Sequence, residues 1–243
     1  MCALCATAVA AGGCGGGGSA GPTSFERVHF FATDGVRLDG RLFGDGKVGV
    51  VLTHMGRPGD TQRDWLGLAR TLAAKDYRVL TYNRRGVCPG GPAGCSGGID
   101  EYDNDWKDVV GAAKFLRQRK AEQIVLAGAS IGAMASLYAA SQGRVRPVAL
   151  IEFAGINNAS GYAFGRPDIA RIRGAKLFLS ARHDVYGGGP APREWYRWAT
   201  PPKRLELVPG TDHGTDLLGP GNPQHARVLA LIVDFLEQAA PAH

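Results

Sequence analysis

Short apolar runs alternate with amphipathic segments along most of this chain. The run VGVVLTH at 48–54 is almost continuously apolar, which is typical of a strand that is buried on both faces of a parallel sheet. The following segment, 60–75, has its large apolar residues at helical spacing. Parallel strands need long crossover connections, which are usually helices. The alternation therefore predicts the α/β class: a doubly wound, mostly parallel sheet with helices on both faces.

The same pattern continues to the C-terminus. Residues 26–46 are expected to form an antiparallel hairpin with its turn at Asp34-Gly35. At 243 residues and 44% hydrophobic content, the chain suits one large domain, predicted over 25–243. Functional residues are expected in the loops after the carboxyl ends of the strands. Further strands are expected at 77–86, 124–127, 146–155, 175–182 and 203–210, and helices at 102–119, 133–140, 192–199 and 225–238.

The first 24 residues differ from the remainder. They contain no charged residue, and they pass from an apolar stretch that is too short to span a bilayer into a Gly/Ser-rich segment. AVAAGGC followed by GGGGSAG resembles the end of a bacterial lipoprotein signal, and by that resemblance Cys14 carries the lipid. We therefore expect residues 1–24 to be a leader and tether of an exported, lipid-anchored protein. A cytoplasmic enzyme with a disordered tail is the alternative.

The net charge of +6 comes from basic residues spread along the chain. The densest runs, NRRG at 83–86 and RVR at 144–146, are only a few residues long. Nucleic-acid binding calls for a clustered basic face with interleaved aromatic residues, which the sequence does not display. We expect a solvated surface with no nucleic-acid partner, membrane contact only through the N-terminal anchor, and a monomer or weak oligomer.

Two cysteines lie in the predicted domain. Cys88 and Cys95 bracket the loop CPGGPAGC, which is flexible enough to close into a small disulfide ring in an oxidising compartment. Two free thiols are the alternative. No second cysteine pair or nearby histidine completes a four-ligand metal site. We expect no metal and no cofactor, because neither a phosphate-cradling loop nor a nicotinamide fingerprint occurs.

The pattern G-x-S-x-G occurs three times in this glycine-rich chain, around Ser19, Ser96 and Ser130. Only Ser130 has an apolar strand before it and a helix-prone segment after it, the context in which a sharp turn exposes a serine above a sheet. The small residues then have a physical cause, because a Cβ at Gly128 or Gly132 would press against neighbouring backbone. Ser130 is therefore the candidate nucleophile.

A serine hydroxyl needs a base, and the base needs a carboxylate that orients it. His213 follows the last predicted strand in a polar loop, and Asp184 follows the strand before it. Asp212 and Asp216 are too close in sequence to His213 to approach its ring from the buried side. Glu152, at the end of an earlier strand, is a weaker rival for the acid. We predict a site made of Ser130, His213 and Asp184.

The order Ser130, Asp184, His213 after successive strands resembles the α/β-hydrolase fold, over residues 26–238. LTHMGRPGDTQRDW resembles the family's oxyanion-hole turn and following helix, and YRVLTYNRRGVCPGG resembles its strand ending in an Arg-Gly turn. The chain is most similar to single-domain serine esterases like dienelactone hydrolases and monoacylglycerol lipases. The resemblance implies cleavage of a small-molecule carboxylic ester through an acyl-enzyme. Acyl transfer by the same triad, or a non-catalytic binding role, are the alternatives.

The resemblance also implies two backbone donors for an oxyanion. One is the N–H of Ile131, and the other belongs to Met55 or Gly56. His54 is expected to be a turn residue that is hydrogen-bonded to nearby backbone.

The stretch 154–175 leaves no room for the long helical cap of many relatives. An open pocket of this kind suits a small acyl chain or the exposed ester of a larger substrate. Its candidate walls are aromatic, with ordinary packing as the alternative for each: Tyr162, Phe164, Tyr186 and Trp195.

Overall fold

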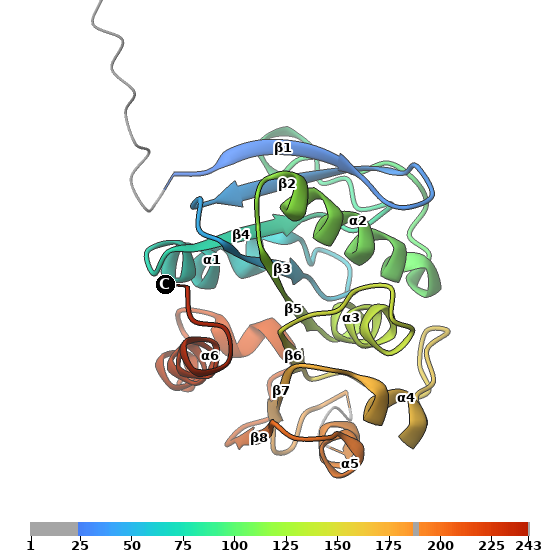
Figure 1. The fold of residues 1–243 in the computed structure, drawn as a ribbon, viewed down its shortest axis with the longest axis vertical. Coiled ribbons are helices and arrows are strands. Elements are labelled where there is room, and N and C mark those ends of the chain that lie inside the picture. Colours follow the sequence, from blue (N-terminus) through green and yellow to red (C-terminus); the bar gives the residue numbers. More distant parts are fainter. Residues whose placement is uncertain (1–23, 187–189, 243) are drawn as a thin grey trace, which may run out of the picture.

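The computed structural model describes residues 24–186 and 190–242, and its centre is one eight-stranded sheet (Figure 1). The strand order is β1-β2-β4-β3-β5-β6-β7-β8, and all pairs from β4 to β8 are parallel. The predicted doubly wound α/β fold is therefore confirmed. The strands are β1 (Glu26–Phe31), β2 (Arg37–Phe43), β3 (Val48–Thr53), β4 (Tyr77–Tyr82), β5 (Gln123–Ala129), β6 (Ala149–Phe153), β7 (Ala175–Ala181) and β8 (Lys203–Val208).

The sheet begins with the predicted hairpin. β1 and β2 pair antiparallel, with Glu26 opposite Leu42, and their connection turns through Gly35, whose φ is +86°. β2 then pairs antiparallel with β4. β4 pairs with β3 on one side, and the hairpin supplies β2 as its partner on the other side. The backbone groups along that edge of β4 are therefore hydrogen-bonded and not exposed.

Helices cover both faces of the sheet, as Figure 1 shows. α1 (Leu66–Ala73) and α6 (His225–Ala239) lie on one face. The other face is covered by α2 (Asp105–Gln118), α3 (Ile131–Ser141), α4 (Arg166–Arg171) and α5 (Pro190–Trp198). Each face has its own apolar core because alternate residues of a strand point to opposite sides. In β5, for example, Val125 joins the α1/α6 core and Leu126 joins the other.

Strand burial follows from this layered arrangement. All six residues of β3 are buried, as expected for a parallel strand that is covered on both faces. β8, at the edge of the sheet, keeps partly exposed side chains along most of its length. Since β3 and β5 lie at the middle of the sheet, the loops that follow them are held by the most completely packed part of the molecule.

Between β6 and β7 the chain forms a loop and the short helix α4, so no helical cap is inserted at this point. Cys88 and Cys95 form the predicted disulfide. No helix in the described ranges is long and apolar enough to cross a membrane. The predicted leader and the lipid-bearing Cys14 lie outside the described residues.

Candidate active site

Ser130 stands at a strained turn between β5 and α3. Its backbone has φ +53° and ψ −120°, in the left-handed half of conformational space that non-glycine residues seldom adopt. A Cβ on Gly128 would overlap the Gly132 carbonyl, and one on Gly132 would lie 2.7 Å from the His54 oxygen. The two glycines thus allow β3, β5 and α3 to approach closely around the serine.

Hydrogen bonds hold this turn at the carboxyl edge of the sheet. The Ser130 N–H donates to the Phe153 carbonyl at the end of β6 (2.9 Å), and the Ser130 carbonyl accepts from Ala133 N–H in the first turn of α3 (3.0 Å). Ile131 is the first residue of that helix. Its N–H precedes the intrahelical ladder, and the helix dipole makes this end favourable for negative charge.

Asp184 and His213 meet beyond the ends of β7 and β8. The His213 Nδ1 lies 2.8 Å from Asp184 Oδ2 and 2.9 Å from Oδ1, and both side chains are buried. Nδ1 is the donor to an ionised carboxylate, which leaves Nε2 as the basic nitrogen. The Tyr186 N–H also donates to Asp184 Oδ1 (2.9 Å). The carboxylate is therefore held from two directions while it orients the imidazole.

Ser130 and His213 open into one small pocket of about 130 Å³. Gly56, Ile131 and Tyr186, all expected from the sequence, line it as well. The Tyr186 ring centroid is 4.8 Å from that of His213. The sequence offered no signal for the remaining lining residues, which come from loops and helices far apart in the chain: Arg57, Tyr102, Met134, Ile156, Ala159 and Ser160.

The turn after β3 is fixed by a buried histidine. The Arg84 N–H donates to His54 Nε2 (3.0 Å), so Nδ1 carries the proton and donates to the Met55 carbonyl (2.6 Å). Burial and the nearby Arg84 guanidinium lower the pKa of His54 well below its usual value, which keeps it neutral. His54 is therefore the backbone-bonded turn residue that the sequence analysis expected. The Met55 side chain is buried beside Gly214 rather than in the pocket.

The family model described as the alpha/beta hydrolase fold matches residues 49–193, which is more than half of the 243-residue chain. The chain belongs to the alpha/beta hydrolase fold family. No curated protein sequence matches this hydrolase. Membership of this family supports a hydrolase activity.

Solved structures with the same fold include esterases. The Pyrococcus furiosus esterase Pf2001 has a TM-score of 0.70 at 15% identity, over 89% of this chain and 91% of its own. XC6422 of Xanthomonas campestris, described as a serine hydrolase without a lid, has a TM-score of 0.70 at 20% identity, over 91% and 98%. The Pyrococcus horikoshii acylaminoacyl peptidase has a TM-score of 0.67 at 16% identity, over 90% of this chain and 42% of its own. At these identities the likeness concerns the fold.

Three of the four aromatic residues proposed as pocket walls pack elsewhere in the hydrolase. Tyr162, Phe164 and Trp195 are buried in the α2–α5 core, in a row in which neighbouring rings are 5.6–6.3 Å apart. This corrects the expectation for these three residues, because their rings contact one another and not the pocket. The Tyr162 hydroxyl accepts the Trp106 N–H at the start of α2 (3.2 Å), which joins its loop to that helix. Tyr186 alone of the four lines the pocket.

The other acidic residues around the site have partners of their own. Arg57, which lines the pocket, donates to both oxygens of Asp216 (2.7 and 2.8 Å) and also pairs with Asp60. Asp212 accepts from Asn222 (2.9 Å). Among the described residues, the carboxylate that bonds to the His213 ring is thus that of Asp184, while Asp212 and Asp216 bond to Asn222 and Arg57.

Glu152, the weaker rival for the acid, is completely buried at the end of β6. Its Oε1 accepts the Gly155 N–H, and its Oε2 has no hydrogen-bond partner among the described residues. The pKa of Glu152 is raised to about 8, mainly by burial and in smaller part by the nearby Asp184 carboxylate, while the Gly155 N–H opposes both. A neutral Glu152 thus holds the turn from which Ile156 reaches the pocket.

Ser96, the second match to G-x-S-x-G, has a structural role. Its hydroxyl donates to the Asn83 carbonyl (2.6 Å) and accepts the Asp39 N–H (2.9 Å), and the side chain is buried. It joins the disulfide loop to β2 and to the end of β4. Ser19, the first match, lies outside the described residues.

Proposed function

We propose that this hydrolase cleaves a carboxylic ester through an acyl-enzyme on Ser130. The observation that carries the proposal is the shared pocket of Ser130 and His213, with the far side of the imidazole held by Asp184. The strained φ of Ser130 also supports it, because such strain persists where the surrounding structure imposes it and is concentrated at functional sites.

The chemistry follows from the orientation of His213. Its Nε2 accepts the Ser130 hydroxyl proton as Oγ attacks the ester carbonyl carbon, and Asp184 stabilises the imidazolium that forms. The tetrahedral intermediate then collapses: the bond to the alcohol oxygen breaks, and Nε2–H returns the proton to that oxygen. His213 then deprotonates a water molecule, which attacks the carbonyl carbon of the acyl-enzyme. The bond from this carbon to Ser130 Oγ breaks, Nε2–H returns the proton to Oγ, and the carboxylic acid leaves.

The oxyanion donors we propose are the backbone N–H groups of Ile131 and Gly56. In a trans peptide the carbonyl of one residue and the N–H of the next point in opposite directions. The Met55 carbonyl points to buried donors on His54 and Arg84, so the Gly56 N–H points away from them. A Cβ on Gly56 would lie only 3.0 Å from Ile131 Cγ2, which shows how closely the two segments approach. These contacts favour Gly56 over Met55.

Pocket size indicates a short acyl group. The volume of about 130 Å³ is well below the range of roughly 300–1,000 Å³ that is usual for drug-sized ligands. Ile156, Met134 and Ala159 supply apolar wall, whereas no helical cap covers the pocket between β6 and β7. We therefore propose a small acyl chain in the pocket and an alcohol portion that extends into solvent.

The test is hydrolysis of p-nitrophenyl acetate, butyrate and octanoate by the full chain, beside Ser130→Ala and Ser160→Ala. Ser160 is a matched control, because it is an exposed serine that lines the same pocket and also has positive φ. We expect turnover that favours acetate or butyrate, is abolished in Ser130→Ala and is retained in Ser160→Ala. Turnover that survives in Ser130→Ala would contradict the proposal.

A further inference from the structure

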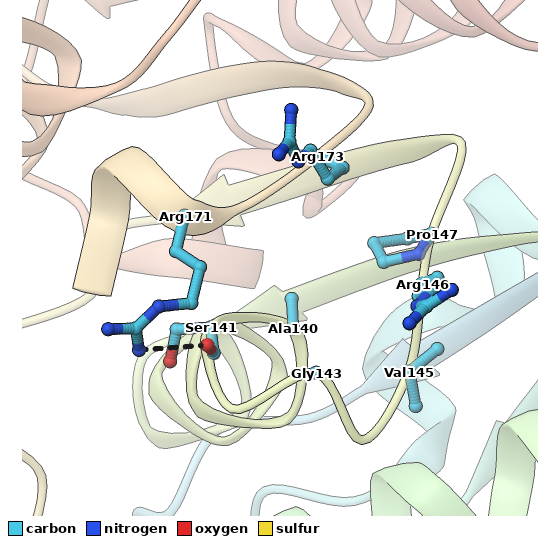
Figure 2. Close-up of a pocket in the computed structure, with 8 residues that line it drawn as sticks. All are labelled: Ala140, Ser141, Gly143, Val145, Arg146, Pro147, Arg171 and Arg173. Atoms are coloured by element: carbon cyan, nitrogen blue, oxygen red, sulfur yellow. Dashed lines mark hydrogen bonds between the residues drawn. The ribbon is translucent and has the colours of Figure 1, made fainter. Parts of the chain in front are cut away.

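A second cavity, of about 440 Å³, lies far from the proposed active site. Figure 2 shows its three guanidinium groups: Arg146 comes from the connection between α3 and β6, and Arg171 and Arg173 come from the end of α4 and the segment after it. These segments precede β6 and β7, so the cavity is at the amino edge of the parallel sheet. Ser130 and His213 follow their strands and lie at the opposite edge.

An adjoining cavity of about 470 Å³ continues this surface along α2. The two cavities share Val145 and Arg146 in their walls. Their basic residues are all exposed, and together we call them the basic face: Lys114, Arg117, Arg144, Arg146, Arg171 and Arg173.

The basic face concentrates charge that the sequence distributes. It holds six of the chain's 28 lysine and arginine residues, in a chain whose net charge is +6. Among the described residues that line the two cavities, none is acidic. The nearest recorded counter-charge is Asp168, 3.7 Å from Arg171. Folding thus gathers exposed basic residues from α2, the α3–β6 connection and the α4–β7 connection onto one face.

A buried lysine lies at the same edge of the sheet. Lys176, at the start of β7, is fully buried, and its Nζ donates to the Ile172 carbonyl (3.1 Å). Burial lowers the pKa of Lys176 to about 8, and the positive charges of Lys203 and Arg173 add to this lowering. Lys176 thus adds one more basic group beneath this edge, close enough to Arg173 for its charge to affect the lysine.

Two observations indicate that the partner of the basic face is a surface that carries phosphate groups but no nucleotide bases. No aromatic side chain lines either cavity within the described part of the chain, so neither cavity offers a ring on which a nucleotide base could stack. The nearby Trp106 ring already has cations over it, Arg144 at 5.7 Å and Lys107 at 5.9 Å from its centroid. The described chain also starts at this edge, because Glu26 at the beginning of β1 pairs with Arg119 just after α2. Cys14, the predicted lipid-bearing residue, precedes Ser24 by ten positions, so an anchor there would hold this edge near a bilayer.

We propose that the basic face docks on an anionic membrane surface, with the Arg146, Arg171 and Arg173 cavity receiving the phosphate of a lipid headgroup. Arginine suits this role because its planar donors match phosphate oxygens in pairs. Docking in this orientation leaves the Ser130 pocket at the far edge of the sheet, open to substrate from the solvent. This proposal is independent of the esterase chemistry, since it concerns a different edge of the molecule.

The experiment measures vesicle binding by the full chain that carries Cys14→Ser, so that no lipid on Cys14 contributes. Vesicles of phosphatidylcholine with about one-third phosphatidylglycerol are compared with pure phosphatidylcholine at about 0.1 M salt, where the Debye length is about 10 Å. The test variant combines Arg146→Gln, Arg171→Gln and Arg173→Gln in this background.

The matched control removes the same charge from the opposite face. It combines Arg63→Gln, Arg70→Gln and Arg227→Gln, three exposed residues on or beside α1 and α6. A basic residue close to an anionic bilayer contributes about 1 kcal/mol, or about fivefold in partitioning. We expect binding to the anionic vesicles to fall on the order of 100-fold in the test variant and by less than about fivefold in the control. Circular dichroism and ester hydrolysis should be unchanged in both.

Three results would overturn the proposal. One is equal loss of vesicle binding in the two triple variants, which would make the attraction a property of net charge alone. Another is equal binding to anionic and neutral vesicles. The third is binding of the parental chain to a DNA duplex but not to the vesicles, lost in the test variant, which would assign the basic face to nucleic acid.

Discussion

Replacing Glu152 by glutamine should remove a pH dependence from the stability of the folded protein. The side chain is completely buried, with one oxygen on the Gly155 N–H and the other without a partner among the described residues. A glutamine has nearly the same shape and keeps an oxygen for that N–H, but it cannot ionise. It therefore mimics the neutral acid at every pH.

The sign of this pH dependence follows from the direction in which the pKa of Glu152 is shifted. Burial raises the pKa of Glu152 from 4.5 to about 8 in the folded protein, with a further contribution from Asp184. Between these values the folded protein keeps a proton that the unfolded chain has released, so rising pH favours unfolding. The stabilisation is fully present below pH 4.5, is lost as pH rises towards 8, and changes little above that.

The size of the effect on the free energy of unfolding is set by the pKa of Glu152 in the unfolded chain and in the folded protein. At about 1.4 kcal/mol per pKa unit, the rise from 4.5 to about 8 corresponds to about 5 kcal/mol, of which about 4 kcal/mol falls between pH 5 and pH 9. The free energy of unfolding of Glu152→Gln should thus be within about 1 kcal/mol of the parental value at pH 5. It should exceed the parental value by roughly 4 kcal/mol at pH 9.

Urea denaturation at pH 5, 7 and 9 measures this difference, because ionisations common to both proteins cancel between them. Glu237→Gln is the control, since Glu237 is about half exposed and pairs with Lys75 on the surface. Its difference from the parental protein should stay nearly constant with pH. A constant difference for Glu152→Gln over the same range would refute the buried, neutral Glu152 described here.

Three further changes test other parts of the structure. Asp184→Asn should lower kcat for ester hydrolysis on the order of 10⁴-fold with little change in urea midpoint, because the amide no longer fixes the tautomer of the histidine; near-normal turnover would contradict its role. Gly128→Ala should destabilise the folded protein by about 1–3 kcal/mol and abolish activity, because the new Cβ meets backbone atoms in α3. Its control is Gly67→Ala in α1, where there is open space for a Cβ and where we expect a stabilisation of about 0.5–1 kcal/mol. Urea midpoints measure both changes. Replacing Cys88 and Cys95 by serine should cost about 2–3 kcal/mol in the same assay, from the loop that their disulfide closes, and an unchanged midpoint would contradict this.

Short-range sequence patterns were sufficient to predict the fold class. The β3 run is apolar throughout because both faces of that strand are covered, and Ser130 is surrounded by small residues because backbone approaches Gly128 and Gly132 closely. Each of these signals lies within a short stretch of chain. The α/β class, the approximate positions of strands and helices, and the candidate nucleophile could therefore be predicted before any contact between distant residues was known.

Features that depend on packing between distant segments were not predictable. Tyr162 and Trp195 follow strands that lead to the site, yet their rings belong to the core on one face of the sheet. Arg57 reaches the pocket through its pairing with Asp216, 159 positions away in the sequence. Side-chain direction at a loop decides such placements, and neither periodicity nor composition encodes it.

The basic face shows the same limit more strongly. Arg117, Arg146 and Arg173 are widely separated in the sequence, so the sequence alone shows no cluster of positive charge. Their common location follows from topology, since α2, the α3–β6 connection and the α4–β7 connection all end at the amino edge of the sheet. A charged surface of this kind can be found only once the strand order is known.

The central claim is that Ser130 is the nucleophile, activated by His213, and covalent labelling tests it most directly. The full chain is treated with a fluorophosphonate, and the modified peptide is identified by mass spectrometry. We expect a single adduct on Ser130, absent from Ser130→Ala, strongly slowed in His213→Ala and unchanged in Ser160→Ala. Labelling that persists in Ser130→Ala, or a folded parental protein that is not labelled at all, would contradict the account.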